Sequence, residues 1–404
     1  MNILFLAHRI PYPPNKGDKI RSFHLLQYIS IRGNLFLGSL FDDPRDKKYL
    51  TALQNLCADS AVFPLNARRK KILSVACHTF RRPASVCYFY NHKLQDWVDN
   101  LLKKKEIDLV FCFSSTMAEY VFRSSAFHHS AKSTIPLLMD FCDVDSVKWV
   151  DYAKIKPWPL SSFFRKEGVL LQQYEQRILK EFSHCFLASS REKSLFQKIH
   201  DFSDIHVVEN GVDLNYFQPT SQETPDIPPP ILVFTGAMDY DVNIDGVSWF
   251  VHAIWPDIKK YQPDVQFYIV GSNPTQEVLK LADIAGVHVT GYVDDIRSFY
   301  NRATICIAPL RIARGIQNKV LEAMAMGKPV ICTSNAFEGI TAQPDRDLLV
   351  YDEPVDFAGQ IVTLLAHPER RKQLGRNARL CMESHYSWDS QLSVLDPFLS
   401  DTTR

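Results

Sequence analysis

The sequence predicts an α/β protein with two doubly wound parallel sheets, as two Rossmann-like domains that follow each other along the chain. Short apolar runs alternate with helix-length segments through most of the 404 residues, which is the pattern of repeated βαβ units. The runs are apolar almost throughout, as in strands that helices cover on both faces of a sheet. The alternation stops once, over the proline-rich, polar residues 218–230, and then resumes.

Each half of the chain supplies five predicted strands. In the first half they are 2–7, 35–41, 108–115, 136–144 and 184–190. In the second half they are 231–236, 265–271, 287–292, 303–310 and 328–334. Since ligands of open parallel sheets bind beyond the carboxyl ends of the strands, we expect a site in a cleft between the two domains.

The pause at 218–230 has the composition of an interdomain linker. It predicts an N-terminal domain over 1–217, a C-terminal domain over 218–384 and a final helix over 385–404. The helical pattern breaks near Tyr386, and Asp389 is placed to cap the helix that resumes. An apolar stripe then needs a partner, and the alternative is that it stays on its own domain. The stripe consists of Leu392, Val394, Leu395 and Phe398.

Composition excludes several classes of protein. The net charge of +1 gives no global field for nucleic acid. Nine cysteines without a C-x-x-C pair indicate reduced thiols, and the apolar run Ile3–Ala7 is too short for a signal peptide. We expect a cytoplasmic protein that could also lie on the inner face of the plasma membrane through the basic, aromatic residues 68–82. The alternative for 68–82 is a solvated helix face.

The segment "GIQNKVLEAMAMGKPVICTS", from Gly315 to Ser334, has the strongest functional pattern. Its first residues would offer backbone N–H groups at a helix N-terminus, where anions and above all phosphate bind. Lys319 adds a positive charge, and Glu322 could accept hydrogen bonds from the two hydroxyls of a ribose. The alternative is that Glu322 only favours the helix dipole. The residues at the helix start are Gly315, Ile316, Gln317 and Asn318.

The sequence "KVLEAMAMGKPVICTSNAFEGI" resembles the signature of retaining glycosyltransferases of family four, which have the GT-B fold. In that family the glutamate matching Glu322 holds the ribose of the sugar nucleotide. A second glutamate, eight residues earlier, usually contacts the donor sugar, but this chain has Arg314 there. The departure leaves the identity of the sugar open.

Other motifs extend the resemblance over nearly the whole chain. They are "VVENGVDLNYFQP" (207–219), "VFTGAMDYDVNIDGVSWF" (233–250) and "VTGYVDDIRSFYNRATICIAPLR" (289–311). The resemblance implies that 1–217 is the acceptor domain, that 218–384 is the donor domain, and that the final helix over 385–404 crosses back to the first domain. Residues 8–22, 140–149 and 236–246 resemble sugar transferases associated with bacterial exopolysaccharide and exosortase (PEP-CTERM) gene clusters.

The resemblance implies further donor-binding residues around the strand ends. The family's base-binding loop corresponds to Gly291, Tyr292 and Val293, with the Val293 backbone facing the base. Relatives hold the diphosphate with basic residues after Gly236, but none stands between Gly236 and Trp249 here. Asn243 could donate hydrogen bonds, and the charge would come from Arg311, Arg314 and Lys319.

The loop after the first strand, "PYPPNKGDKIRS", would bring three cations, Lys16, Lys19 and Arg21, to the cleft. Gly17 lets its backbone approach a ligand closely. In the family a glycine-containing loop here lies near the donor phosphates and the acceptor. The alternative is a solvated proline-rich turn.

Acceptor binding is predicted for residues at two other strand ends. His8 ends the first strand, and Asp140, Asp143 and Asp145 end the fourth. These acids fail the EF-hand pattern, so we expect hydroxyl binding or helix capping. No metal and no cofactor is expected beyond the nucleotide sugar as co-substrate.

These observations predict a metal-independent glycosyltransferase that moves a sugar from a nucleotide-diphosphate sugar to a hydroxyl of a glycan or lipid-linked acceptor. Retention of configuration is implied by the resemblance, as is a role in exopolysaccharide or cell-surface glycan synthesis. The chain would stabilise the departing diphosphate electrostatically. Two alternatives remain, a nucleotide-sugar epimerase of the same architecture and a catalytically weakened nucleotide-sugar-binding subunit.

Overall fold

The computed structural model describes residues 1–14, 17–66, 70, 74–78, 80–104, 107–128, 135–202, 204–219, 229–313 and 315–400. The chain forms two compact units. The first consists of Met1–Glu209 together with Leu392–Arg404, and the second of Asn210–Gln391. The division therefore falls at Glu209–Asn210 and again at Gln391–Leu392.

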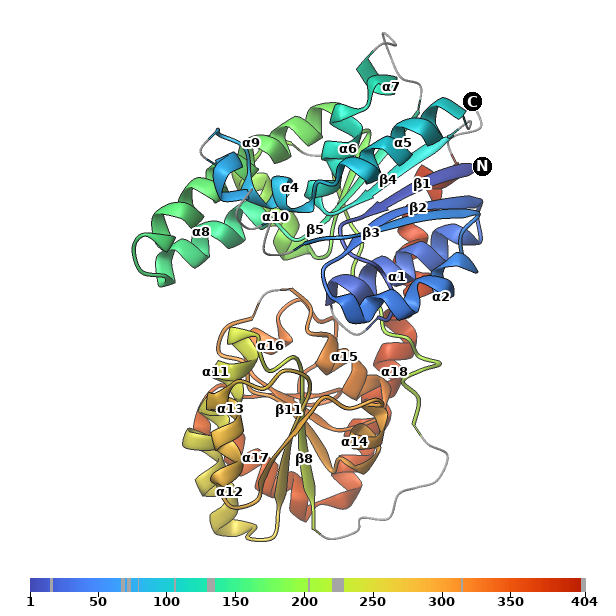
Figure 1. The fold of residues 1–404 in the computed structure, drawn as a ribbon. Helices are drawn as coiled ribbons and strands as arrows, with labels where there is room; N and C mark the ends of the chain where they lie inside the picture. The colour runs from blue at the N-terminus through green and yellow to red at the C-terminus, as the bar shows by residue number, and fades with distance from the viewer. Residues whose placement is uncertain are drawn as a thin grey trace. The chain divides into compact units, whose positions relative to one another are not determined.

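The first unit contains a seven-stranded parallel sheet in the order β3-β2-β1-β4-β5-β6-β7, with helices on both faces (Figure 1). Its strands are β1 Asn2–Ala7, β2 Asn34–Phe41, β3 Asp59–Pro64, β4 Leu109–Phe113, β5 Leu137–Cys142, β6 His184–Leu187 and β7 Ile205–Val207. Its helices are α1 Gly17–Ser30, α2 Leu50–Gln54, α4 Ala84–Phe89, α5 His92–Lys104, α6 Ala118–Arg123, α7 Ser125–His128, α8 Asp145–Ile155, α9 Leu160–Glu181 and α10 Ser190–Ile199. Residues Pro44–Tyr49 and Ser115–Met117 are 3-10 turns. The central strand β1 pairs with β2 and β4 and is buried from Ile3 to Ala7.

The second unit contains a six-stranded parallel sheet in the order β10-β9-β8-β11-β12-β13, again between helices (Figure 1). Its strands are β8 Ile231–Thr235, β9 Gln266–Val270, β10 Val287–Gly291, β11 Ile305–Ala308, β12 Val330–Cys332 and β13 Leu349–Val350. Its helices are α11 Asp241–Trp249, α12 Trp255–Tyr261, α13 Gln276–Lys280, α14 Arg297–Arg302, α15 Asn318–Ala325, α16 Ser334–Phe337, α17 Pro354–Ala366, α18 Pro368–His385 and α19 Trp388–Leu392. Residues Phe250–Ile254 form a π-turn and Leu281–Asp283 a 3-10 turn.

The predicted strands and the fold class are confirmed. All ten apolar runs contain a strand of one of the two parallel sheets, at the predicted places. The sequence interpretation missed β3, β7 and β13, which lie at the edges of the sheets. Two of these, β7 and β13, have only three and two residues, too few for a recognisable apolar pattern.

The end of the chain packs on the first unit. After the bend at Tyr386 the chain forms α19, the 3-10 turn Ser393–Leu395 and α20 Asp396–Ser400. The Phe398 ring centroid lies 4.5 Å from that of His184 and 4.6 Å from that of His206. Asp396 accepts hydrogen bonds from Tyr28, at 2.7 Å, and Arg32, at 3.0 Å.

Two details of the tail differ from the sequence prediction. The hydroxyl of Ser387, rather than Asp389, accepts a hydrogen bond from a backbone N–H of α19, that of Ser390. Leu392 and Leu395 are buried, but Val394 is 41% exposed and does not belong to the apolar stripe. The reason is the 3-10 turn at 393–395, which changes the helical spacing.

Among the described residues, no helix has the length and apolarity needed to cross a membrane. All nine cysteines are free thiols, and six of them are buried. They pack as small apolar side chains.

Candidate functional site

The second sheet has a topological switch point between β8 and β11. From β8 the chain moves outward through β9 to β10, and it then returns to β11 on the other side of β8. The loops at the carboxyl ends of β8 and β11 therefore diverge and leave a crevice between them, which is where such sheets bind ligands. The predicted residues Gly236, Asn243, Lys319 and Glu322 all lie around this point.

Two glycines allow the backbone to pack tightly at the end of β8. A Cβ atom at Gly271, whose φ is +153°, would lie 1.7 Å from the carbonyl oxygen of Gly236. A Cβ atom at Gly236 would lie 2.7 Å from the Nδ2 atom of Asn243. Only glycine fits at these two positions without moving the loop.

Lys319 and Asn243 connect the two sides of the switch point. Lys319 lies in the first turn of α15, and its ammonium donates a 3.0 Å hydrogen bond to the Oδ1 atom of Asn243 on α11. The Asn243 amide in turn donates to the carbonyl of Ala237, at 2.8 Å. Asn243 is 4% exposed. A positive charge is thereby fixed beside the loop that follows β8.

Glu322 ends a chain of hydroxyl groups from the neighbouring elements. Its Oε2 atom accepts a 2.9 Å hydrogen bond from the Tyr300 hydroxyl, and that hydroxyl lies 2.8 Å from the Oγ1 atom of Thr235. Because Tyr300 donates to Glu322, Thr235 must donate to Tyr300. The bond uses Oε2, and within the described part of the chain Oε1 has no hydrogen-bond partner. Oε1 could therefore accept a hydrogen bond from a ligand.

Burial perturbs both charged groups of this site. It raises the pKa of the Glu322 carboxyl to about 7, although the Tyr300 hydrogen bond and the charge of Lys319 favour the carboxylate. It lowers the pKa of the Lys319 ammonium to about 8, against the attraction of Glu322. Both groups therefore change charge near neutral pH, which is common at functional sites.

The N-terminus of α15 has the features expected of an anion site. Gly315 has a positive φ of 64°, which turns the chain into the helix, and Gln317 precedes its first residue without a side-chain cap. The Oδ1 atom of Asn318 is buried and lacks a donor among the described residues. Ile316 is buried, at 8% exposure. Arg314 lies outside the described residues.

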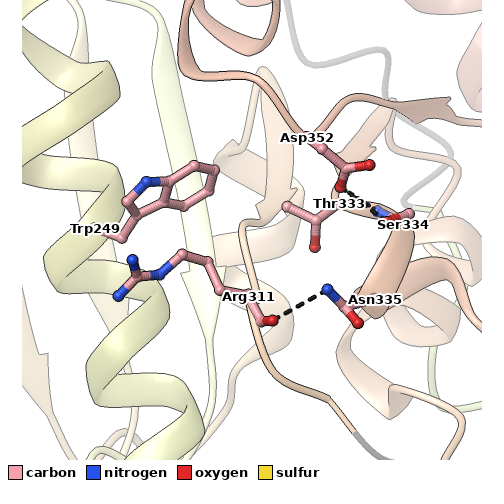
Figure 2. Close-up of a pocket in the computed structure, with 6 residues that line it drawn as sticks. All are labelled: Trp249, Arg311, Thr333, Ser334, Asn335 and Asp352. Carbon is pink, nitrogen blue, oxygen red and sulfur yellow. Dashed lines mark hydrogen bonds between the residues drawn. The ribbon is translucent and has the colours of Figure 1, made fainter.

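Arg311 is held by an acidic neighbour. Its guanidinium forms an ion pair with Asp245 on α11, so part of its charge is already compensated. Beside it lies a pocket of about 180 Å³, in which the Asn335 amide donates to the Arg311 carbonyl (Figure 2). The pocket is lined by Trp249, Arg311, Thr333, Ser334, Asn335 and Asp352.

The end of β10 exposes the segment predicted to face the base. Gly291 has φ +70° and Tyr292 is 67% exposed, whereas Val293 packs against the core of the unit. The turn at Gly291 leaves the following backbone at the carboxyl edge of the sheet, two strands away from β8.

In the first unit, the expectation of a cationic loop is corrected. Helix α1 begins at Gly17, so Lys19 and Arg21 are helical rather than in a loop. Arg21 is fully buried, with its guanidinium 2.8 Å from the Asp140 carboxylate and a second hydrogen bond to the Val208 carbonyl. Lys19 is likewise buried against Asp46, at 2.7 Å. Lys16 lies outside the described residues.

The buried Arg21–Asp140 pair joins helix α1 to strand β5, so neither side chain is presented to a ligand. Of the other predicted acceptor residues, His8 lies 3.4 Å from the Asp18 carboxylate and its ring packs on Phe89. Asp143 is half-buried. Asp145 begins α8, and burial raises the pKa of its carboxyl.

The sequence interpretation missed Tyr300 and Asp245, which contact predicted site residues, and Thr235, which contacts Tyr300. Tyr300 lies in the segment 289–311 that was singled out, but no spacing rule connects it to Glu322, 22 positions away. Asp245 and Arg311 are 66 positions apart. Both contacts depend on the tertiary structure.

Comparison with known proteins gives a consistent classification. Residues 229–367 match the family model described as glycosyl transferases group 1. A GDP-mannose-dependent mannosyltransferase of Corynebacterium glutamicum, acting on monoacylated alpha-(1-6)-phosphatidylinositol monomannoside, is 27% identical over 45% of this chain and 52% of its own. An uncharacterised protein of the Klebsiella pneumoniae cps region is 24% identical over 38% of this chain and 42% of its own. The matched part spans about half the length of these curated relatives.

Solved structures agree over almost the full length. Sucrose-phosphate synthase from Thermosynechococcus elongatus has a TM-score of 0.71 at 18% identity, covering 99% of this chain and 98% of its own. HepE of Anabaena, solved with UDP, has a TM-score of 0.68 at 15% identity, covering 99% and 100%. The chain therefore has the GT-B fold, and its residues 229–367 match the glycosyl transferases group 1 family.

Proposed function

We propose that this protein is a glycosyltransferase that moves a sugar from a nucleotide-diphosphate sugar to an acceptor hydroxyl, with retention of configuration. The observation that carries the proposal is the Lys319–Asn243 hydrogen bond across the switch point, with Glu322 on the next turn of the same helix. The group 1 match over 229–367 covers this whole constellation.

Each group then has a distinct task. The Oε1 atom of Glu322 would accept from a ribose hydroxyl, while Tyr300 fixes the carboxylate through Oε2. The ammonium of Lys319 and the N–H groups at Gly315–Asn318 would balance the diphosphate, because an anion at a helix N-terminus is stabilised by unpaired N–H groups. In a dry site such preorganised donors stabilise the charge of the leaving group.

The remaining roles extend from this donor site. The backbone after Gly291 would contact the base. The loop at Gly236 would contact the donor. Arg311 would reach the phosphates once it is released from Asp245, and Arg314 is assigned to them from the sequence alone. In the first unit, His8, Asp143 and Asp145 remain candidates for the acceptor, and Lys16 and Gly17 for the donor phosphates. Arg21 and Asp140 are omitted because they neutralise each other.

The relatives indicate which donors to examine first. HepE was solved with UDP and with UDP-glucose, and the C. glutamicum enzyme depends on GDP-mannose. A cps-region relative is in keeping with a role in exopolysaccharide or cell-surface glycan synthesis, on a glycan or lipid-linked acceptor. We propose that neither a metal nor a cofactor takes part, and that the protein acts in the cytoplasm, where residues 68–82 could contact the membrane.

Binding and turnover test this function separately. Calorimetry with UDP and GDP should show binding by the wild type that Glu322→Gln and Lys319→Gln weaken. Glu369→Gln, an exposed carboxylate on α18, serves as the control. Incubation with radiolabelled nucleotide sugars should then give transfer or slow hydrolysis. An isomerised donor would instead identify an epimerase, and binding without turnover a nucleotide-sugar-binding subunit.

A further inference from the structure

Helices α8 and α9 of the first unit form a rigid antiparallel hairpin. They run side by side, and the turn between them lies at the end away from the sheet (Figure 1). A Cβ atom at Gly168 would lie 2.6 Å from a methyl group of Val150, so the glycine allows close packing. The rings of Trp149 and Phe164, 5.1 Å apart, close the space between the helices. The position of the turn is thus fixed by packing.

The turn exposes three large apolar side chains in a row. Ile155 is 68% exposed, Trp158 81% and Leu160 49%. They lie within six residues, and Trp158 stands between Pro157 and Pro159. We call Ile155, Trp158 and Leu160 the hairpin tip. Soluble monomers rarely expose such clusters unless they serve to bind something.

Cations predominate around the hairpin tip. From Tyr152 to Lys166 the sequence has four cations and no acid. Arg165 and Lys166 are exposed on the first turns of α9, and Lys154 is exposed beside Asp151. The fourth cation is Lys156.

The residues around His78 also lie along α9. The His78 ring lies 4.3 Å from the Phe163 ring, and its Nδ1 atom lies 3.2 Å from Glu167 on α9. The residues that follow lie further along the same helix, since Arg81 and Arg82 line a pocket with Gln173 and Arg177. Phe80 is 81% exposed, and Arg81 and Arg82 are exposed as well.

We propose that the hairpin tip inserts into the surface of an anionic lipid bilayer. A tryptophan between apolar neighbours suits the headgroup boundary, where the side chains of the tip would be buried. Lysine and arginine around an apolar anchor are attracted to an anionic surface. The inference rests on the membrane contact included in the proposed function and extends it to the hairpin tip, and it uses no residue of the nucleotide site.

The charge distribution favours a bilayer over a second copy of the chain. In a symmetric dimer through the tip, the same surface would face itself. The cations of one copy would then lie against those of the other, and like charges in contact are unfavourable. An anionic membrane compensates the same cations.

The test is co-sedimentation of the full chain with vesicles of phosphatidylcholine alone and with vesicles that also contain anionic phosphatidylglycerol. The variant is Ile155→Ser with Trp158→Ser. The matched control is Ile31→Ser with Val355→Ser, because these apolar side chains are 78% and 73% exposed but lie elsewhere. A second variant, Arg165→Gln with Lys166→Gln, tests the charge. All substituted side chains are exposed, so unchanged melting temperatures should show that the variants fold.

We expect the wild type and the control to bind the anionic vesicles, and the tip variant to bind them at least about tenfold more weakly. The charge variant should lose most of the preference for anionic lipid. Wild-type protein that ignores these vesicles, or a tip variant that binds like the control, would overturn the proposal. So would a wild-type dimer in light scattering that the tip variant abolishes. Vesicle binding is measured without nucleotide, so its failure is distinct from failure of the proposed function.

Discussion

The pair Lys319 and Glu322 shows how burial determines chemistry at single residues. Both lie on α15, three positions apart, but their hydrogen-bond partners come from α11 and α14. Burial moves both pKa values toward neutrality. Each group therefore has a charge that a ligand can stabilise or remove.

Replacing Glu322 by glutamine should change the pH dependence of folding. The carboxyl has a folded pKa of about 7, above its unfolded value near 4.5. Between these values the folded state holds a proton that the unfolded state has lost, so stability falls as the pH rises. Between pH 4.5 and 7, the free energy of unfolding of Glu322→Gln should therefore fall less than that of the wild type, by on the order of 1–3 kcal/mol. Urea unfolding at a series of pH values measures this difference.

Glu369→Gln is the control, since its carboxylate is exposed. Identical pH profiles for wild type and Glu322→Gln would contradict the burial of this carboxyl. In the same variant, nucleotide affinity should fall by about 1.5–3 kcal/mol, the typical loss of a charged hydrogen-bond partner. Unchanged calorimetric affinity would exclude the ribose role.

Lys319 predicts the pH dependence of nucleotide binding. Its pKa of about 8 in the free protein means that above this pH the neutral amine must take up a proton to balance a diphosphate. Affinity for UDP or GDP should therefore fall by up to about tenfold per pH unit above 8. Lys319→Gln should bind weakly at every pH from 7 to 9.5. A wild-type affinity that stays constant over that range would rule out the phosphate role.

At this scale the sequence predicts residue types better than their partners. Asn243, Lys319 and Glu322 could be selected from helix termini and from a family signature. Tyr300 could not, because a buried tyrosine is indistinguishable in sequence from a core residue. The buried contact between Arg21 and Asp140 could not be predicted either. Asp140 stands at a predicted strand end and Arg21 in a predicted loop, but they are 119 positions apart and only the tertiary structure brings them together.

Among the elements, the C-terminal tail shows what the spacing of apolar residues can and cannot predict. The apolar run, the break near Tyr386 and the burial of Leu392 and Leu395 follow from sequence pattern. The Ser387 cap and the exposure of Val394 do not, because a 3-10 turn replaces the helix at 393–395. The edge strands β7 and β13 were not predicted for a related reason, since two or three residues are too few to show a period.

Phe398 should contribute measurably to stability through its contacts with His184 and His206. Phe398→Ala should lower the free energy of unfolding by about 1–3 kcal/mol, less than for a fully buried ring, because Phe398 is half-buried. Val394→Ala is a control on the same segment and should cost less than about 0.5 kcal/mol. Equal effects of the two substitutions would show that the ring does not anchor the tail.

For the whole molecule, the proposed chemistry predicts independence from divalent ions. The diphosphate charge is assigned to Lys319 and to backbone N–H groups, and Asp140 is neutralised by Arg21. Excess EDTA should therefore change the rate of sugar transfer by less than about twofold. Complete loss of activity that magnesium or manganese restores would show that a metal site had been overlooked.

The path of the chain through the two units has a consequence for protein engineering. The second unit is continuous, from Asn210 to Gln391, whereas the first is completed by the residues that follow it. The second unit is in effect a domain inserted into the first. A chimera with a single junction after Glu209 would import a foreign tail, without a matched Asp396 for Tyr28 and Arg32. Exchange of donor specificity between relatives therefore requires two junctions, which replace 210–391 and keep the native ending.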